Sequence, residues 1–235
     1  MEVVMATNEK RFVVTGEQSL RLGNASAELN RQLYLQRDTK LNPEHVIATL
    51  QGMTEGKLAP FTGGLRGRFI RTMPIQIGGV PKDELLEQVR AVRSIYPYAE
   101  SMMKHKSFTT LGEQESAILI DLSSADLGFT ENPTMDEFLG EERLARWSAA
   151  NLDSYIVELC PAEVGPHFAI QYKNQPKGEV LWIAMKRLPD SVGYPHVFHV
   201  ERYDDGELWL GGGWADPGGR WSLGGRVLFR LRKAS

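Results

Sequence analysis

The hydrophobic pattern of the first 67 residues is typical of helices. After a short apolar run, Phe12 to Val14, leucine and alanine recur at helical spacing between Ser19 and Leu35. A second helix is expected from Asn42 to Gly52, because Asn42 suits the N-cap and Pro43 suits the first helical position. Glycine and proline between residues 52 and 67 predict a linker. We therefore expect residues 1–67 to form an N-terminal helical segment.

From residue 68 onward the pattern predicts helices mixed with many strands. Strands are expected at 69–77 and 117–122, and helices at 82–94 and 134–151. Further strands are predicted at 155–159, 168–172, 180–186, 197–203, 208–210 and 227–231. Helices followed by strands favour an α+β fold with an antiparallel sheet, so residues 68–235 are expected to form one α+β module.

Composition narrows the class of protein. With 42% hydrophobic residues, 24% charged residues and a net charge of −3, the chain offers no electrostatic basis for binding nucleic acid. No apolar run is long enough to span a membrane, and the N-terminus lacks the pattern of a signal peptide. A single cysteine, Cys160, excludes an internal disulfide framework. We expect a cytoplasmic globular protein.

Catalytic chemistry finds little support in the sequence. His196 and His199 lie three apart in a predicted strand and would face opposite sides of a sheet, which is a poor arrangement for one metal ion. Cys160 lies between Glu158 and Glu163, whose charges oppose thiolate formation. Neither a phosphate-binding loop nor a nucleophile elbow occurs. We expect no enzyme activity, no metal and no cofactor.

The segment from Gly206 to Gly225 is unusual in composition. It holds eight of the chain's 23 glycines and three of its five tryptophans. Glycines that form turns and tryptophans that anchor them to a core would explain this pattern. A shallow binding site with tryptophan as its fixed framework would explain it as well.

A resemblance bears on this choice. The motifs that carry it are Ile120–Thr134, Leu159–Pro166, Gln171-Tyr172 with Gln175-Pro176, Gln76–Gly79 and Phe229–Lys233. Over Phe69 to Lys233 the chain resembles a family of hypothetical proteins common in bacteria of the candidate phyla radiation. Relatives in that family carry Asn or Asp at positions where this chain has Gly, Ser or Asp. A codon for Asn or Asp becomes a codon for Gly, Ser or Asp when only its adenines are changed.

That substitution pattern is similar to the variable region of target proteins of diversity-generating retroelements. The resemblance implies a C-type-lectin-like fold over about residues 116–233, and one departure is Leu223, where proline is expected. It also implies that a protein or cell-surface ligand binds the C-terminal segment. The candidate ligand-binding residues are Trp209, Gly211, Gly213, Trp214, Asp216, Gly218, Gly219, Arg220, Trp221, Ser222, Gly224, Gly225 and Arg226.

The expected fold is thus α+β, with N-terminal helices followed by a C-type-lectin-like module that has a small antiparallel sheet. Two alternatives remain open. One is a regulatory or scaffold protein that acts through the N-terminal helices. The other is an enzyme of the formylglycine-generating type, which would need a pair of cysteines where this chain has Cys160 alone.

Overall fold

The computed structural model describes residues 3–7, 10–14, 71–152 and 155–234, and the chain divides into two compact units, Met1–Ala59 and Pro60–Ser235. In the first unit, β1 (Val3–Thr7) and β2 (Lys10–Val14) form an antiparallel hairpin. The helices expected at 19–35 and 42–52, and the linker expected at 52–67, lie outside the described residues.

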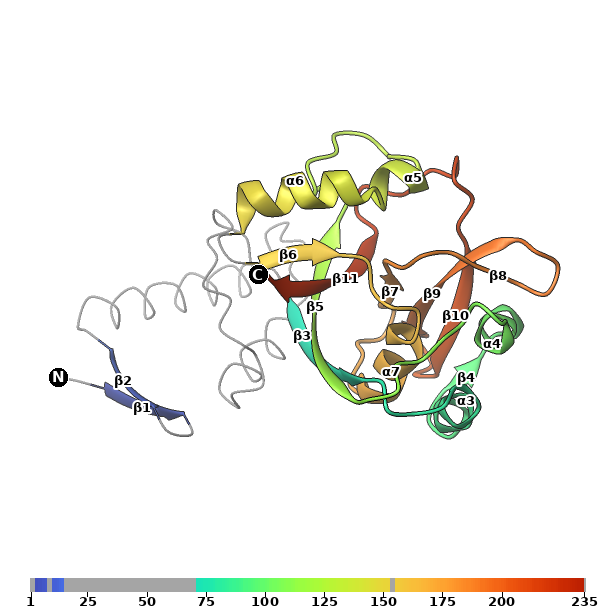
Figure 1. The fold of residues 1–235 in the computed structure, drawn as a ribbon, viewed down its shortest axis with the longest axis horizontal. Coiled ribbons are helices and arrows are strands. Elements are labelled where there is room, and N and C mark those ends of the chain that lie inside the picture. The colour runs from blue at the N-terminus through green and yellow to red at the C-terminus, as the bar shows by residue number, and fades with distance from the viewer. Residues whose placement is uncertain (1–2, 8–9, 15–70, 153–154, 235) are drawn as a thin grey trace. The chain divides into compact units, whose positions relative to one another are not determined.

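The second unit is built on a nine-stranded mixed sheet (Figure 1). Its strands are β3 (Thr72–Ile77), β4 (Ser94–Ile95), β5 (Glu115–Ser123), β6 (Tyr155–Glu158), β7 (Val180–Ile183), β8 (Leu188–Pro189), β9 (Pro195–Arg202), β10 (Leu208–Trp214) and β11 (Arg226–Lys233). The strand order is β3-β5-β11-β7-β9-β10-β4, with β6 paired to β11 and β8 paired to β9. The β11–β7 and β10–β4 pairs are parallel, and the other pairs are antiparallel.

The expected fold class is therefore wrong. The described residues show a large mixed sheet, so neither the small antiparallel sheet nor the C-type-lectin-like module fits the molecule. The described helices are short, at 4 to 11 residues. Strands of two residues, such as β4 and β8, carry no alternating pattern, and the parallel pairs join strands far apart in the chain. Two-residue strands and pairings between distant strands leave no periodic pattern of apolar residues in the sequence, so the hydrophobic pattern could not predict them.

The most apolar segments of the chain form the central strands of the sheet. In β5, Leu119, Ile120 and Leu122 are fully buried, and in β11 Leu228 and Phe229 are fully buried. Consecutive buried residues show that both faces of these strands are covered, as expected for the middle of a large sheet.

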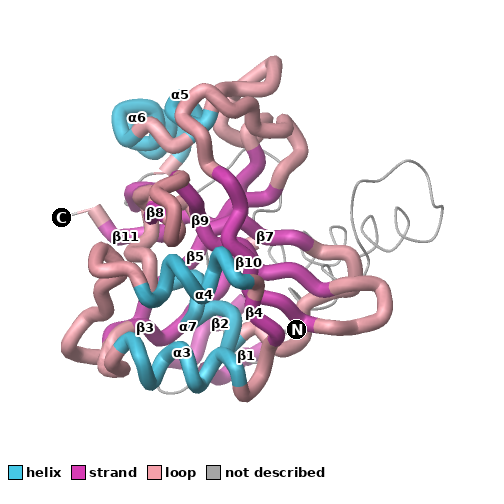
Figure 2. The backbone as a smooth tube through the Cα atoms, turned by 90° about the vertical axis from the view of Figure 1, so that its right-hand side faces the viewer, coloured by secondary structure: helices cyan, strands magenta, loops and turns pink. Residues whose placement is uncertain are grey.

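Five helices flank the sheet in the described part of the chain. They are α3 (Lys82–Arg90), α4 (Pro97–Lys104), α5 (Met135–Phe138), α6 (Glu141–Asn151) and α7 (Val164–Gln171). Figure 2 shows α3, α4 and α7 together, with α5 and α6 at another end of the unit. The helix expected over 134–151 is divided between α5, which begins at a capping box of Thr134 and Glu137, and α6.

The strand predicted at 168–172 is wrong, because these residues belong to α7 and the turn that ends it. Pro166 lies in the first turn of this helix, where no backbone N–H is needed. A short apolar run such as Phe168 to Ile170 is equally typical of a buried strand and a buried helix. Gly165 lets α7 approach the sheet, since a Cβ there would lie 2.7 Å from the Cβ of Phe198 in β9.

Arg93 joins this helix to the rest of the unit. Its side chain is buried and donates to the carbonyl oxygens of Ala169 (2.5 Å) and Tyr172 (2.6 Å) at the C-terminal end of α7. A third hydrogen bond goes to the side-chain oxygen of Gln175 (2.9 Å), which is itself fully buried and donates to the carbonyl of Val200 in β9. Burial lowers the pKa of Arg93 to about 10, so the guanidinium stays charged at neutral pH. The residue thus caps a helix and fixes its position against the sheet.

Replacing this residue tests its role. The substitution Arg93→Met removes the donor from three acceptors, two of which are buried, and we expect the free energy of unfolding to fall by about 1–3 kcal/mol in urea denaturation. Arg146→Met is the matched control, because the Arg146 side chain is 74% exposed and its contact with Glu142 is 3.5 Å long. A change within about 0.5 kcal/mol is expected there. Equal effects of the two substitutions would contradict the role assigned to Arg93.

Candidate functional site

The glycine run in β10 is required by packing on both faces of the strand. A Cβ on Gly211 would lie 2.2 Å from ring atoms of His199, and a Cβ on Gly213 would lie 2.2 Å from the ring of Trp182. On the opposite face, a Cβ on Gly212 would lie 2.7 Å from the sulfur of Met102 in α4. A real Cβ atom is essentially never found this close to another heavy atom, so only glycine fits at these positions. The rings of His199 and Trp182 therefore lie directly against the backbone of β10.

These rings belong to a row of aromatic side chains that ends in the core. The ring centroids of Trp182 and His199 are 4.7 Å apart, and Trp221 meets Trp182 edge-on at 4.9 Å. Trp221 also stacks on Phe138 of α5 at 5.5 Å and is only 8% exposed. Trp221 is therefore part of the scaffold.

Trp209 is held in a second aromatic group at the other end of β10. Its ring lies 4.5 Å from the ring of Tyr96 and 6.1 Å from that of Tyr203, and the two tyrosine hydroxyls are hydrogen-bonded to each other. The indole N–H donates to the Glu207 carboxylate at 3.1 Å. Trp209 is half-buried and its position is fixed by these contacts.

Trp214, by contrast, is 63% exposed and lies in a cluster of exposed apolar side chains. The ring of Tyr194 is 6.3 Å away, in an edge-to-face arrangement. Trp214 pairs across the strands with His196, and the ring of Tyr98 in α4 stacks on His196 at 5.1 Å. Trp214, Tyr194, His196 and Tyr98, together with Val192, which is exposed in the same turn as Tyr194, are called the aromatic patch below.

The turn that carries Val192 and Tyr194 is organised by Asp190. One oxygen of this buried carboxylate accepts the backbone N–H groups of Val192 and Tyr194, each at 2.9 Å. Removal from water opposes ionisation of Asp190, but the N–H groups of Tyr194 and Val192 outweigh it and lower its pKa. The turn is therefore held in place around neutral pH, and it presents two exposed apolar side chains in a fixed geometry.

The loop 215–225 is also fixed, because backbone hydrogen bonds attach it to the segment 132–136. The carbonyls of Pro217 and Gly219 accept from Asp136 (3.3 Å) and Met135 (2.8 Å), and the N–H of Trp221 donates to Pro133 at 2.7 Å. At its start, the N–H of Ala215 donates to Pro195, so the loop leaves the sheet beside the aromatic patch.

The structure divides the candidate residues into two groups. Packed or paired residues are Trp209, Gly211, Gly213, Trp221, Gly225 and Arg226. Exposed residues are Trp214, Asp216, Gly218, Gly219, Arg220, Ser222 and Gly224. Arg226 lies 2.9 Å from Asp121 and 3.1 Å from Asp126, and Gly225 leaves room for the Trp221 ring. Only the exposed group is placed to meet a ligand directly.

Sequence reasoning missed the other members of the aromatic patch. Val192 and Tyr194 are apolar residues in a short turn bounded by Asp190 and Pro195, where polar residues are usual, and this was the available signal. No local signal connects Tyr98 to Trp214, because the strand register and the position of α4 bring them together.

The histidines and the cysteine that were considered for catalysis pack against neighbouring side chains or backbone. His196 and His199 lie on opposite faces of β9, with His196 against Tyr98 and His199 against Trp182. Cys160 is buried, its thiol is 3.5 Å from the carbonyl of Leu228, and burial raises its pKa. In the described ranges, no group of three His, Cys, Asp or Glu residues is arranged to hold a metal ion.

Comparison with known proteins gives no family. No protein-family model, curated protein or solved structure matches the chain. Within the part that the structure describes, no helix has both the length and the apolar character needed to cross a membrane. The resemblance to the family of hypothetical proteins therefore stays a prediction.

The packing of β10 leads to a prediction with a control in the same segment. We expect Gly213→Ala to lower the free energy of unfolding by about 1–3 kcal/mol, because its methyl group would overlap the ring of Trp182. Gly224→Ala should change it by less than about 0.5 kcal/mol, since a Cβ there meets no heavy atom within 4 Å. Urea denaturation measures both. If Gly213→Ala left the free energy of unfolding unchanged, Trp182 would not lie against the backbone of β10.

Proposed function

We propose that the protein acts by binding a protein ligand, and that the aromatic patch together with the exposed part of the loop 215–225 forms its recognition surface. The observation that carries the proposal is the gathering of exposed apolar side chains. Eight large hydrophobic residues are exposed in the described part of the chain, and four of them, Tyr98, Val192, Tyr194 and Trp214, lie in this patch. Exposed apolar residues scattered singly are ordinary, but a group of four on adjoining elements is typical of an interaction site.

The residue types also favour a protein ligand. Tryptophan and tyrosine dominate binding energy at protein interfaces, because each buries a large area while few rotatable bonds are restricted. The turn held by Asp190 and the loop attached to residues 132–136 are ordered before a ligand arrives. Such preorganisation reduces the entropic cost of association.

The surroundings of the patch supply polar contacts. Asp216, Arg220 and Ser222 are exposed on the adjacent loop and can form hydrogen bonds at the rim of an interface. Arg220 already donates to the carbonyl of Asn132 at 2.8 Å through one nitrogen of its guanidinium. The other donors of this planar group leave it suited to a carboxylate on the ligand.

The same geometry bears on diversification by a retroelement. We propose that a retroelement diversifies this segment and that the variation is concentrated at exposed positions such as Asp216, Gly218, Ser222 and Gly224. Substitution at Gly211 or Gly213 would displace His199 or Trp182 from the sheet, so these glycines are poor positions for variation.

Removal of the central aromatic residue tests the binding proposal. We expect Trp214→Ser to weaken capture of the protein's partner from a native extract by about thirtyfold, because an interface hot spot contributes at least about 2 kcal/mol. Leu111→Ser is the control, since Leu111 is 38% exposed and lies outside the patch. Thermal unfolding should show that both variants stay folded. Unchanged capture by Trp214→Ser would refute this surface as the binding site.

Sequencing of the encoding locus tests the diversification proposal separately. We expect a reverse-transcriptase gene and an imperfect repeat of the codons for residues 209–226, with differences at adenines of the repeat. These differences should fall on the codons of the exposed loop residues rather than on those of Gly211 and Gly213. A locus with no such repeat would contradict diversification and would leave the binding proposal standing.

A further inference from the structure

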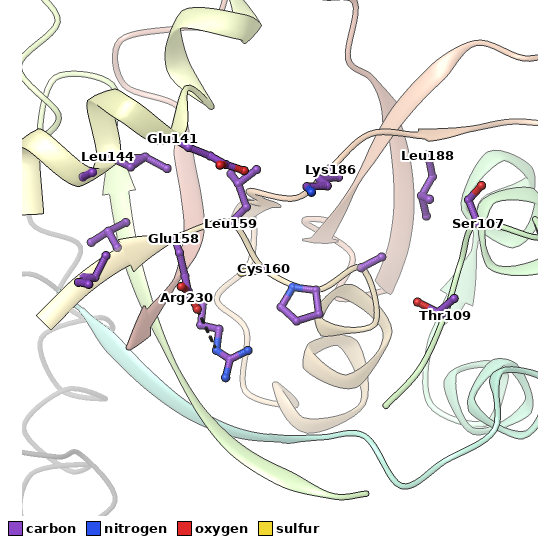
Figure 3. A pocket seen from close by; sticks show the side chains of 15 residues that line it. Ser107, Thr109, Glu141, Leu144, Glu158, Leu159, Cys160, Lys186, Leu188 and Arg230 are labelled. Carbon is purple, nitrogen blue, oxygen red and sulfur yellow. Dashed lines mark ion pairs between the residues drawn. The ribbon is translucent and has the colours of Figure 1, made fainter. Parts of the chain in front are cut away.

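A pocket lies next to, but does not include, the residues of the aromatic patch. It measures about 590 Å³, lies between α6, β6 and the segment that precedes α7, and also contacts residues 107–109 and 186–188 (Figure 3). Pockets that hold small molecules usually measure about 300–1,000 Å³, so its size suits a small organic ligand.

The floor of this pocket is apolar. Leu144 of α6, Val157 of β6, and Leu188 are buried side chains that line it, and Leu159 and Cys160 lie between them. The backbone N–H of Val157 donates to the hydroxyl of Ser148 at 2.9 Å, so α6 already satisfies this edge of β6. The floor can therefore pack against an apolar group of a ligand. The N–H of Val157 is already bonded, so it is not available to pair with an extended peptide as an extra strand.

The rim carries two kinds of charged residue. Arg230 and Glu158 neutralise each other and their neighbours, because Arg230 lies 2.9 Å from Glu115 and 3.5 Å from Glu158, which also contacts Arg232 at 3.1 Å. Lys186 and Glu141 are different. Both are exposed, and neither forms an ion pair or a side-chain hydrogen bond with any residue that the structure describes.

The two unpaired charges lie on either side of one floor residue, Leu159, with Leu144 beyond Glu141 and Leu188 beyond Lys186 (Figure 3). In Figure 3 the Glu141 carboxylate and the Lys186 ammonium flank Leu159. A ligand that carried only a negative charge would gain from Lys186 and be repelled by Glu141, and a cation would meet the reverse. A zwitterion with an apolar side chain satisfies both charges and the floor together.

We propose that this pocket binds a small zwitterion with an apolar side chain, that is, a hydrophobic amino acid or a short hydrophobic peptide. The ligand ammonium lies beside Glu141, the ligand carboxylate lies beside Lys186, and the side chain packs on Leu159 and the apolar floor next to it. The pocket shares no residue with the aromatic patch, although Leu188 pairs with His196 across the strands, and the proposal does not depend on the function proposed for the patch.

A titration with matched ligands tests the assignment. L-phenylalanine, 3-phenylpropionate (which lacks the ammonium) and phenethylamine (which lacks the carboxylate) are added to the full chain, and the methyl NMR signals of Leu144, Leu159 and Leu188 are followed. We expect L-phenylalanine to shift these signals and to bind about fivefold more tightly than either analogue, since an exposed charge contact contributes up to about 1 kcal/mol.

Variants assign each charge to its residue. Lys186→Met should remove the advantage of L-phenylalanine over phenethylamine, and Glu141→Gln should remove its advantage over 3-phenylpropionate. The controls are Lys173→Met and Glu142→Gln, which replace exposed residues that do not line the pocket. If the three methyl signals do not respond to L-phenylalanine, the pocket is not its site. If the analogues bind as well as L-phenylalanine, or if the controls act like the two variants, the zwitterion assignment is wrong.

Discussion

The recognition surface depends on one constraint, the contact of the Trp182 and His199 rings with the glycine backbone of β10. Trp182 and His199 occupy the space that side chains at Gly213 and Gly211 would fill. Their position allows Trp221 to meet Trp182 edge-on and to stack on Phe138, which anchors the loop that joins β10 to β11. The cost in backbone entropy of a glycine-rich strand is offset by close packing of large aromatic surfaces.

The three tryptophans of this segment consequently have different roles. Trp209 and Trp221 are held by neighbouring rings, whereas Trp214 lies at the end of β10, on the face opposite the packed rings of Trp182 and His199, and is exposed. On the helical side, Arg93 and Gln175 attach α7 to the sheet, and α4 packs on β10. The ring of Tyr98 therefore reaches His196 and extends the exposed surface around Trp214. Recognition by this surface relies on shape and apolar area presented by a rigid support.

Sequence reasoning identified several local features and missed the architecture. The strand expected at 117–122 lies within β5, and the helix expected at 82–94 contains α3, because both segments have strong apolar patterns. The width and mixed direction of the sheet could not be predicted, since they depend on pairings such as β7 with β11, whose strands are separated by more than 40 residues in the chain. The segment 168–172 was assigned to a strand because its apolar run has no period that distinguishes a strand from a buried helix.

The candidate site shows the same division. Composition was enough to single out residues 206–225, but it could not separate supporting residues from exposed ones. That separation depends on the register of β10 with β9, which places Gly211 and Gly213 beside the rings of His199 and Trp182. Tyr98 and Tyr194 come from other parts of the chain and join the surface only through the fold.

Hydroxyl-radical footprinting of the tryptophans in the full chain tests most directly whether one tryptophan is presented while the others support it. Side-chain oxidation under these conditions follows exposure to solvent, so mass spectrometry of the cleaved protein gives a rate for each residue. Of the three tryptophans in residues 206–225, we predict that Trp214 is oxidised fastest, Trp209 more slowly and Trp221 slowest. Oxidation of Trp221 at the rate of Trp214 would contradict it, because the loop could not then be anchored in the aromatic row.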